Sequence, residues 1–144
     1  VALALELDAH SGKVLANPIE LHKVILNLCT NAQYAMRECG GTLTLRVADC
    51  RADAALNTRC GSLPAGAYVC VEVRDTGPGI PEEKIPHIFE PFFTTKPDNA
   101  GTGMGLAIVH GIVGEYGGGI LIDNVPGVGV CFRVLLPMVV EEGN

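Results

Sequence analysis

Hydrophobic positions recur with a helical period over one long segment early in the chain. The segment is IELHKVILNLCTNAQYAMRE, residues 19–38. At about 100° per residue its apolar side chains share one broad face, which comprises Leu21, Val24, Ile25, Leu28, Ala32, Ala35 and Met36. Pro18 suits the first turn of a helix and Asn17 can cap it, while Gly40 and Gly41 follow its end. We therefore predict an amphipathic helix over residues 19–38.

Alternating apolar and polar positions predict strands over much of the remaining chain. The predicted strands cover residues 1–10, 42–47, 68–75, 120–124 and 128–137. The last two are joined through Pro126 and Gly127, which favours a hairpin. A second amphipathic helix is predicted over residues 105–115, whereas residues 50–66 show no period and are predicted to form a loop.

Length and composition limit the class of protein. The 144 residues suit one domain spanning the whole chain, and 48% apolar residues with no Trp predict an aliphatic core. No run approaches the roughly 20 apolar residues of a membrane span. A net charge of -6 argues against a general nucleic-acid or membrane-surface binder, because such binding needs a basic face. The chain lacks an initiator Met, so we expect it to be part of a longer protein.

Six cysteines could suggest disulfides or zinc, but none forms a C-x-x-C pair and most lie within apolar patterns. We expect them to be reduced and to act as small hydrophobic residues in a cytoplasmic protein. The four histidines lie in helical patterns, in a turn or near a Pro-bounded helix end, with no spacing typical of zinc ligands. No nucleophile motif such as G-x-S-x-G is present either.

Asp75 is the first candidate for ligand chemistry. It ends the apolar row of a predicted strand and begins DTGPGI, residues 75–80. A carboxylate in that position needs hydrogen-bond donors, and the exocyclic amine of adenine is a suitable one. The alternative is that Asp75 only caps the turn that follows it. Gly77 and Gly79 would let a planar ligand approach the main chain, which favours the ligand.

A second glycine cluster, GTGMGL at residues 101–106, precedes the second predicted helix. Backbone N–H groups at such a helix start bind phosphate well, although many similar turns are ordinary connections. The cluster follows a polar loop rather than a strand, which disfavours a Rossmann turn. The pair Gly12-Lys13 has Leu7 where a P-loop needs its first glycine. A nucleotide site here would therefore be of a third type.

Asn27 and Asn31 project from one edge of the first predicted helix, at the rim of the expected cleft. Their amide oxygens suit Mg²⁺, which takes part of its shell from one or two protein groups and part from phosphates. The alternative is a solvated helix edge. Between the glycine clusters, Phe89, Phe92 and Phe93 could anchor a mobile loop or form a small satellite core, and Lys96 is the best-placed cation for phosphate.

Taken in order, these motifs resemble the catalytic and ATP-binding domain of bacterial sensor histidine kinases, in the superfamily shared with gyrase, mismatch-repair and chaperone ATPases. LNLCTNA (26–32) resembles the N box, DTGPGI (75–80) the first glycine box, FEPFFTTK (89–96) the F box and GTGMGLAIVHG (101–111) the second glycine box. The segment 127–137 is similar to the last glycine motif and strand. The resemblance implies an α/β two-layer sandwich, with a mixed, mostly antiparallel sheet of about five strands and about three helices on one face.

The resemblance also implies roles for single residues. Asn31 would coordinate Mg²⁺ with support from Asn27, and Asp75 would accept from the adenine amine. Gly77, Gly79 and the neighbouring Ile80 would shape the adenine pocket. Phe89 and Phe92 would anchor an ATP lid that contains Lys96. The residues that would close this lid over the phosphates are Gly101, Thr102, Gly103, Met104, Gly105 and Leu106.

Three departures from the family pattern bear on activity. Tyr34 stands where many relatives place a phosphate-binding Lys or Arg, and Val130 where a Thr usually helps to bind adenine through water. No histidine has the acidic neighbour of a phosphoacceptor. The resemblance thus implies a domain that orients Mg-ATP for a histidine on a separate dimerisation domain, from which the phosphate passes to a response regulator receiver domain.

The expected isolated domain is a monomer and the full protein a homodimer, cytoplasmic or membrane-anchored, with no nucleic-acid partner. Two alternatives stay open. Tyr34 and Val130 favour an ATP-binding sensor module without phosphotransfer. A gyrase- or chaperone-type ATPase is the other, although such relatives generally have a Glu base where this chain has Asn27.

Overall fold

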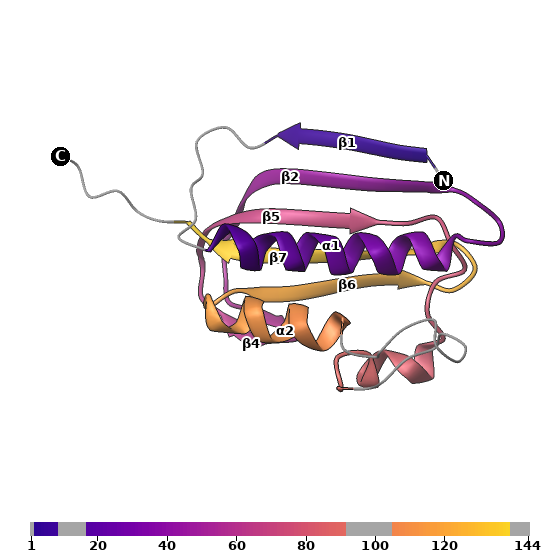
Figure 1. The fold of residues 1–144 in the computed structure, drawn as a ribbon. Coiled ribbons are helices and arrows are strands. Elements are labelled where there is room, and N and C mark those ends of the chain that lie inside the picture. The colour runs from indigo at the N-terminus through magenta and orange to yellow at the C-terminus, as the bar shows by residue number, and fades with distance from the viewer. Residues whose placement is uncertain (1, 9–16, 92–104, 139–144) are drawn as a thin grey trace.

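One sheet with a helical layer on one of its faces organises the chain (Figure 1). The computed structural model describes residues 2–8, 17–91 and 105–138. The helices are α1 (Pro18–Ala35), the short 3-10 helix η1 (Glu82–His87) and α2 (Gly105–Glu115). The strands are β1 (Ala2–Asp8), β2 (Thr42–Ala52), β3 (Leu56–Thr58), β4 (Gly61–Leu63), β5 (Gly66–Arg74), β6 (Gly119–Val125) and β7 (Gly129–Pro137).

The five long strands pair in the order β1-β2-β5-β7-β6. β1 runs parallel to β2, and every other neighbouring pair in this sheet is antiparallel. α1 and α2 lie side by side over the same face of the sheet (Figure 1). The predicted two-layer α/β sandwich with a mixed, mostly antiparallel sheet is therefore confirmed.

Aliphatic side chains fill the space between the sheet and the helices. Val24 and Leu28 of α1, Val109 and Val113 of α2 and Val73 of β5 are each at most 2% exposed and belong to one cluster. The long predicted helix is confirmed, but it ends three residues early. Its cap at residue 36 has φ -100° and ψ 10°, and the glycine at position 40 follows in the left-handed region, at φ 67°.

The prediction of a loop over residues 50–66 is wrong. β2 continues to Ala52, and β3 and β4 pair as an antiparallel hairpin within that segment. Leu63 packs with Tyr68 and Leu135 in a second apolar cluster. Strands of three residues are too short to show a period of two, so tertiary packing rather than local pattern defines this hairpin.

All six cysteines are free thiols. Cys70 and Cys131 are buried, and Cys29, Cys50 and Cys60 are partly so. Burial raises the pKa of Cys70 to about 12, so its thiol stays protonated at neutral pH. In the part of the chain that the structure describes, no helix is long and apolar enough to span a membrane.

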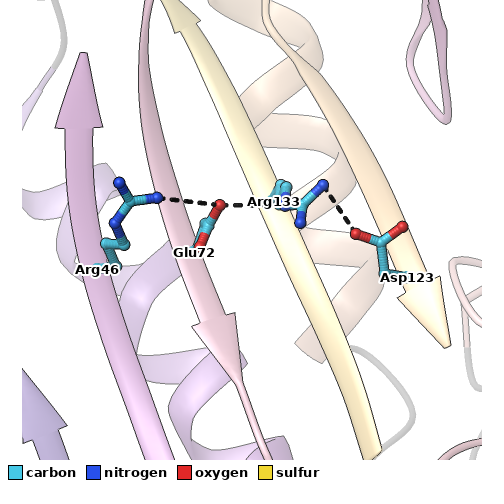
Figure 2. A network of polar contacts seen from close by, with 4 residues as sticks. All are labelled: Arg46, Glu72, Asp123 and Arg133. Atoms are coloured by element: carbon cyan, nitrogen blue, oxygen red, sulfur yellow. Dashed lines mark ion pairs between the residues drawn. The ribbon is translucent and has the colours of Figure 1, made fainter. Parts of the chain in front are cut away.

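The face of the sheet opposite the helices carries a row of alternating charges across four strands (Figure 2). Glu72 Oε1 lies 3.7 Å from Arg46 Nη1 and 3.1 Å from Arg133 Nε. Arg133 Nη1 in turn lies 2.8 Å from Asp123 Oδ2. We call these four residues the charge ladder. Glu72 is its least exposed member, at 16%, and lies between the two arginines.

We expect Glu72→Gln to lower the free energy of unfolding by about 1 to 2 kcal/mol, between the values typical of exposed and of buried ion pairs. The substitution leaves two arginines without their shared anion. Asp123→Asn, at the 57% exposed end of the ladder, is the matched control and should cost about 0.5 kcal/mol or less. Urea titrations at low and high salt measure both. Equal losses would contradict a central role for Glu72.

Candidate functional site

Both asparagines of the N-box-like motif lie on α1. The Nδ2 of Asn27 donates to the carbonyl oxygen of Lys23 at 2.8 Å, which turns Oδ1 away from the helix backbone. A Cβ added to Gly105, the first residue of α2, would lie 3.1 Å from that Oδ1. Asn31 lies one turn further on, is half-buried and makes no side-chain hydrogen bond with another described residue. The start of α2 thus approaches Asn27 closely.

Asp75 follows the last residue of β5 and is only 5% exposed, the one charged residue that is buried in the described part of the chain. Its Oδ1 accepts from the N–H of Gly77 at 2.9 Å, and its own N–H donates to the Val130 carbonyl oxygen at 3.0 Å. Burial raises the pKa of Asp75, and hydrogen bonds with the backbone of Gly77 and Val130 oppose that rise.

The two interpretations of Asp75 are therefore compatible. The hydrogen bond from Gly77 is the turn-capping contact. The pKa of Asp75 is nevertheless raised, so these backbone bonds do not fully compensate the buried charge. A further donor, such as the amine of a bound base, would stabilise the carboxylate.

The loop of residues 75–80 lies against the C-terminal end of α1. A Cβ on Gly77 would lie 3.1 Å from the carbonyl oxygen of Ala35. Thr76 fixes the loop from the same side, because its Oγ1 accepts from the N–H of Thr42 at 2.9 Å. α1 consequently touches the first glycine box near residue 35 and the start of α2 at Asn27. Eight helical residues separate these points by about 12 Å, with Asn31 midway.

Aromatic contacts attach the segment after η1 to the core. The Phe89 ring lies 5.4 Å from the His110 ring of α2 and 6.5 Å from the Phe132 ring of β7, centre to centre. Ile88 beside it is 4% exposed. Phe89 thus packs against both α2 and β7. Of the other predicted lid residues, Gly105 and Leu106 begin α2. The remaining six lie outside the described residues, namely Phe92, Lys96, Gly101, Thr102, Gly103 and Met104.

The residues present fit a hard cation. The Oδ1 of Asn27 faces away from its own helix, and the side chain of Asn31 makes no hydrogen bond with another described residue. Amide oxygens of this kind suit Mg²⁺ when phosphate oxygens complete the shell. No group of three or more His, Cys, Asp or Glu side chains that could hold a metal occurs in residues 2–8, 17–91 and 105–138.

Sequence reasoning missed two residues that hold the first glycine box in place. Thr76 joins it to the start of β2, and Asn124 joins Ile80 to β6. The local sequence does not indicate either contact, since Thr76 is typical of a turn and Asn124 is the polar end of a predicted strand. Both contacts cross more than 30 residues of sequence, so only the tertiary structure reveals them.

Comparison with known proteins gives a consistent result. Residues 16–140 match the family described as histidine kinase-, DNA gyrase B-, and HSP90-like ATPase. The chain is 45% identical over 142 residues to the sensor kinase CckA of Brucella abortus (strain 2308), covering 96% of this chain and 15% of that protein. It is 40% identical over 134 residues to the sensory histidine kinase/phosphatase NtrB of Rhizobium leguminosarum bv. phaseoli, covering 90% and 33%. The chain thus spans a third or less of both.

Solved structures agree with these matches. The catalytic domain of the histidine kinase ThkA is similar with a TM-score of 0.71 and 32% identity, over 94% of this chain and 78% of that one. Full-length ShkA, whose structure is a complex with AMPPNP, is similar with a TM-score of 0.72 and 26% identity. That match covers 99% of this chain and 26% of ShkA.

Proposed function

Because the chain belongs to the family of histidine kinase-, DNA gyrase B- and HSP90-like ATPases, we propose that it is the Mg-ATP-binding catalytic domain of a sensor histidine kinase. The observation that carries the proposal is the placement of Asp75 beside the C-terminal end of α1 and of Asn27 near the middle of that helix. The helix rises about 12 Å between the two points. That separation suits a nucleotide with its base at one end and its phosphates at the other. ShkA, solved with AMPPNP, supports the same ligand class.

In this proposal the base lies against the first glycine box. The Asp75 carboxylate accepts from the exocyclic amine of adenine, which would offset the burial of its charge. Gly77 and Gly79 let the ring approach the main chain, and the half-buried Ile80 contributes apolar contact. Asp75 therefore selects adenine over a base with a carbonyl in the same place.

The phosphates lie towards the start of α2. Asn31 would hold Mg²⁺, with Asn27 in support, and such an ion would supply positive charge to the phosphate oxygens. Backbone N–H groups at residues 101–106 bind the phosphates, with Gly105 and Leu106 in the first turn of α2. Lys96 adds a cation, and Phe89 with Phe92 anchors the lid. The γ-phosphoryl group of ATP would pass in line to a nitrogen of the acceptor histidine, with ADP as the leaving group.

The acceptor comes from outside this chain. We propose a histidine on a dimerisation domain of the same kinase, with the general base beside it, and a response regulator receiver domain as the final acceptor. The relatives are several times longer than this chain, which supports further domains in the whole protein. The catalytic domain is proposed to work in the cytoplasm within a homodimer.

Two departures favour a second candidate, an ATP-binding sensor module without phosphotransfer. Val130 is 5% exposed beside Asp75 and offers no hydroxyl for a bridging water. Tyr34 is not a cation, although the Arg37 guanidinium lies 3.9 Å from its ring centre and keeps a positive charge nearby.

Incubation with γ-labelled ATP, Mg²⁺ and the cognate helical domain tests the function. We expect label on a histidine of that domain, and Asn31→Ala should reduce labelling about 10- to 100-fold or more through loss of the metal ligand. Gln33→Ala, exposed on the same helix, is the matched control. ATP binding without labelled histidine would support the sensor module. Free phosphate released by this chain alone, and lost in Asn27→Ala, would support a gyrase-type ATPase.

A further inference from the structure

Asn124, at the end of β6, exchanges two hydrogen bonds with one residue of the first glycine box. The N–H of Ile80 donates to Asn124 Oδ1 at 2.8 Å, and Asn124 Nδ2 donates to the Ile80 carbonyl oxygen at 2.7 Å. Both distances are short for amide hydrogen bonds. The Asn124 side chain thus pairs with the main chain of Ile80 as a neighbouring strand would.

This exchange completes a row of contacts between residues 75–80 and the hairpin of β6 and β7. The N–H of Asp75 donates to the Val130 carbonyl at 3.0 Å, and the N–H of Gly127 donates to the Pro78 carbonyl at 2.7 Å. Those two bonds join backbone groups, so among substitutions only proline, which lacks the N–H, would remove either of them directly. The bonds to Ile80 depend on a side chain and can be removed alone.

The loop has little room to shift where Asn124 holds it. Gly79 has φ +74°, and a Cβ there would lie 2.9 Å from the Val125 carbonyl oxygen and 3.1 Å from Asn124 Oδ1. An amide is the side-chain group that both donates and accepts in this geometry. A carboxylate would keep the bond from the Ile80 N–H but would set an acceptor against the Ile80 carbonyl oxygen.

We propose that Asn124 is a positioning residue for the base end of the nucleotide site. It holds Pro78 to Ile80 in the conformation in which Asp75 can meet the base, so that binding does not have to order this segment. The inference rests on the proposed function, since it assumes that an adenine nucleotide binds here. It adds a residue that lies outside the four sequence motifs.

Calorimetric titration of ADP and ATP with Mg²⁺ into the 144-residue chain tests this role. Asn124→Ala and the isosteric Asn124→Asp are each expected to raise the Kd about tenfold, the effect of losing one or two neutral hydrogen bonds. The factor should be the same for ADP and ATP, because the contact is at the base end. Val128→Ala, on the same turn and 64% exposed, should change neither Kd by more than about twofold.

Titrations run below the unfolding temperature of every variant, so that a purely structural role can be recognised. A lower Tm in both Asn124 variants with an unchanged Kd would overturn the positioning role and leave the proposed function intact. A loss of affinity for ATP but not for ADP would also overturn the positioning role, since the substitution would then act at the phosphates rather than at the base. If the wild-type chain bound neither nucleotide, the proposed function itself would fail and this role with it.

Discussion

Asp75→Asn is expected to weaken ATP binding by about one to two orders of magnitude without lowering the free energy of unfolding at pH 7. An Asn amide can still accept from the Gly77 N–H, so the turn should survive. The lost interaction is a charge-assisted hydrogen bond from the adenine amine, which is worth about 1.5 to 3 kcal/mol. Calorimetry measures the affinity, and unchanged affinity would refute the role of Asp75.

The pH dependence of stability provides a second measurement on the same variant. Burial raises the pKa of Asp75 above its ordinary value of 3.8, so the folded state holds this proton more tightly than the unfolded state. The contribution of Asp75 to stability therefore falls as the pH rises from that value through the folded-state pKa. Asp75→Asn should remove this fall, whereas Asp123→Asn, at an exposed position, should keep it.

Gly129→Ala is expected to have the largest effect on stability, about 3 kcal/mol or more. Gly129 has φ +148°, and a Cβ there would collide with the carbonyl oxygen of Asp75. The carbonyl oxygen is a backbone atom, and the backbone of Gly129 fixes the position of the Cβ. Relieving the collision would therefore strain the hydrogen bond between Asp75 and Val130. The collision also displaces the residue that would meet the base.

Gly127→Ala is the matched control on the same turn. Gly127 has φ +83°, but a Cβ there would meet no atom within 4 Å. Gly127→Ala should lower the free energy of unfolding by only about 1 to 2 kcal/mol, the cost of placing an alanine at a positive φ. Chemical unfolding of both variants, with ADP binding measured where they are folded, compares the two. Equal losses would show that backbone conformation rather than the collision dominates.

The sequence was most informative where local pattern and tertiary structure coincide. The apolar positions of α1 recur with a helical period over enough turns to predict the helix. The helix ends earlier than predicted because Met36 leaves the helical conformation, which the composition of the segment does not indicate. The hairpin of β3 and β4 was missed because three-residue strands carry no readable period. Asn27, Asn31 and Asp75 could be selected from their motifs, and the structure places them along one helix and beside its end.

The contacts that shape the site were harder to predict. Asn124 and Ile80 lie 44 residues apart in sequence, and nothing in either segment indicates that they pair. The same holds for the approach of Asn27 to Gly105. The first contact depends on the order of strands in the sheet, which brings the hairpin of β6 and β7 beside the end of β5. The second depends on the packing of α1 beside α2.

The charge ladder has a consequence for the hydration of the sheet. An apolar surface laid over the middle of that face would strip water from Arg46, Glu72, Arg133 and Asp123 together, and desolvation costs several kcal/mol per ion. Within the sheet these charges already compensate one another while water remains in contact. The two faces of the sheet therefore differ in hydration: the face beneath the helices is apolar and buried, and the face that carries the charge ladder is solvated.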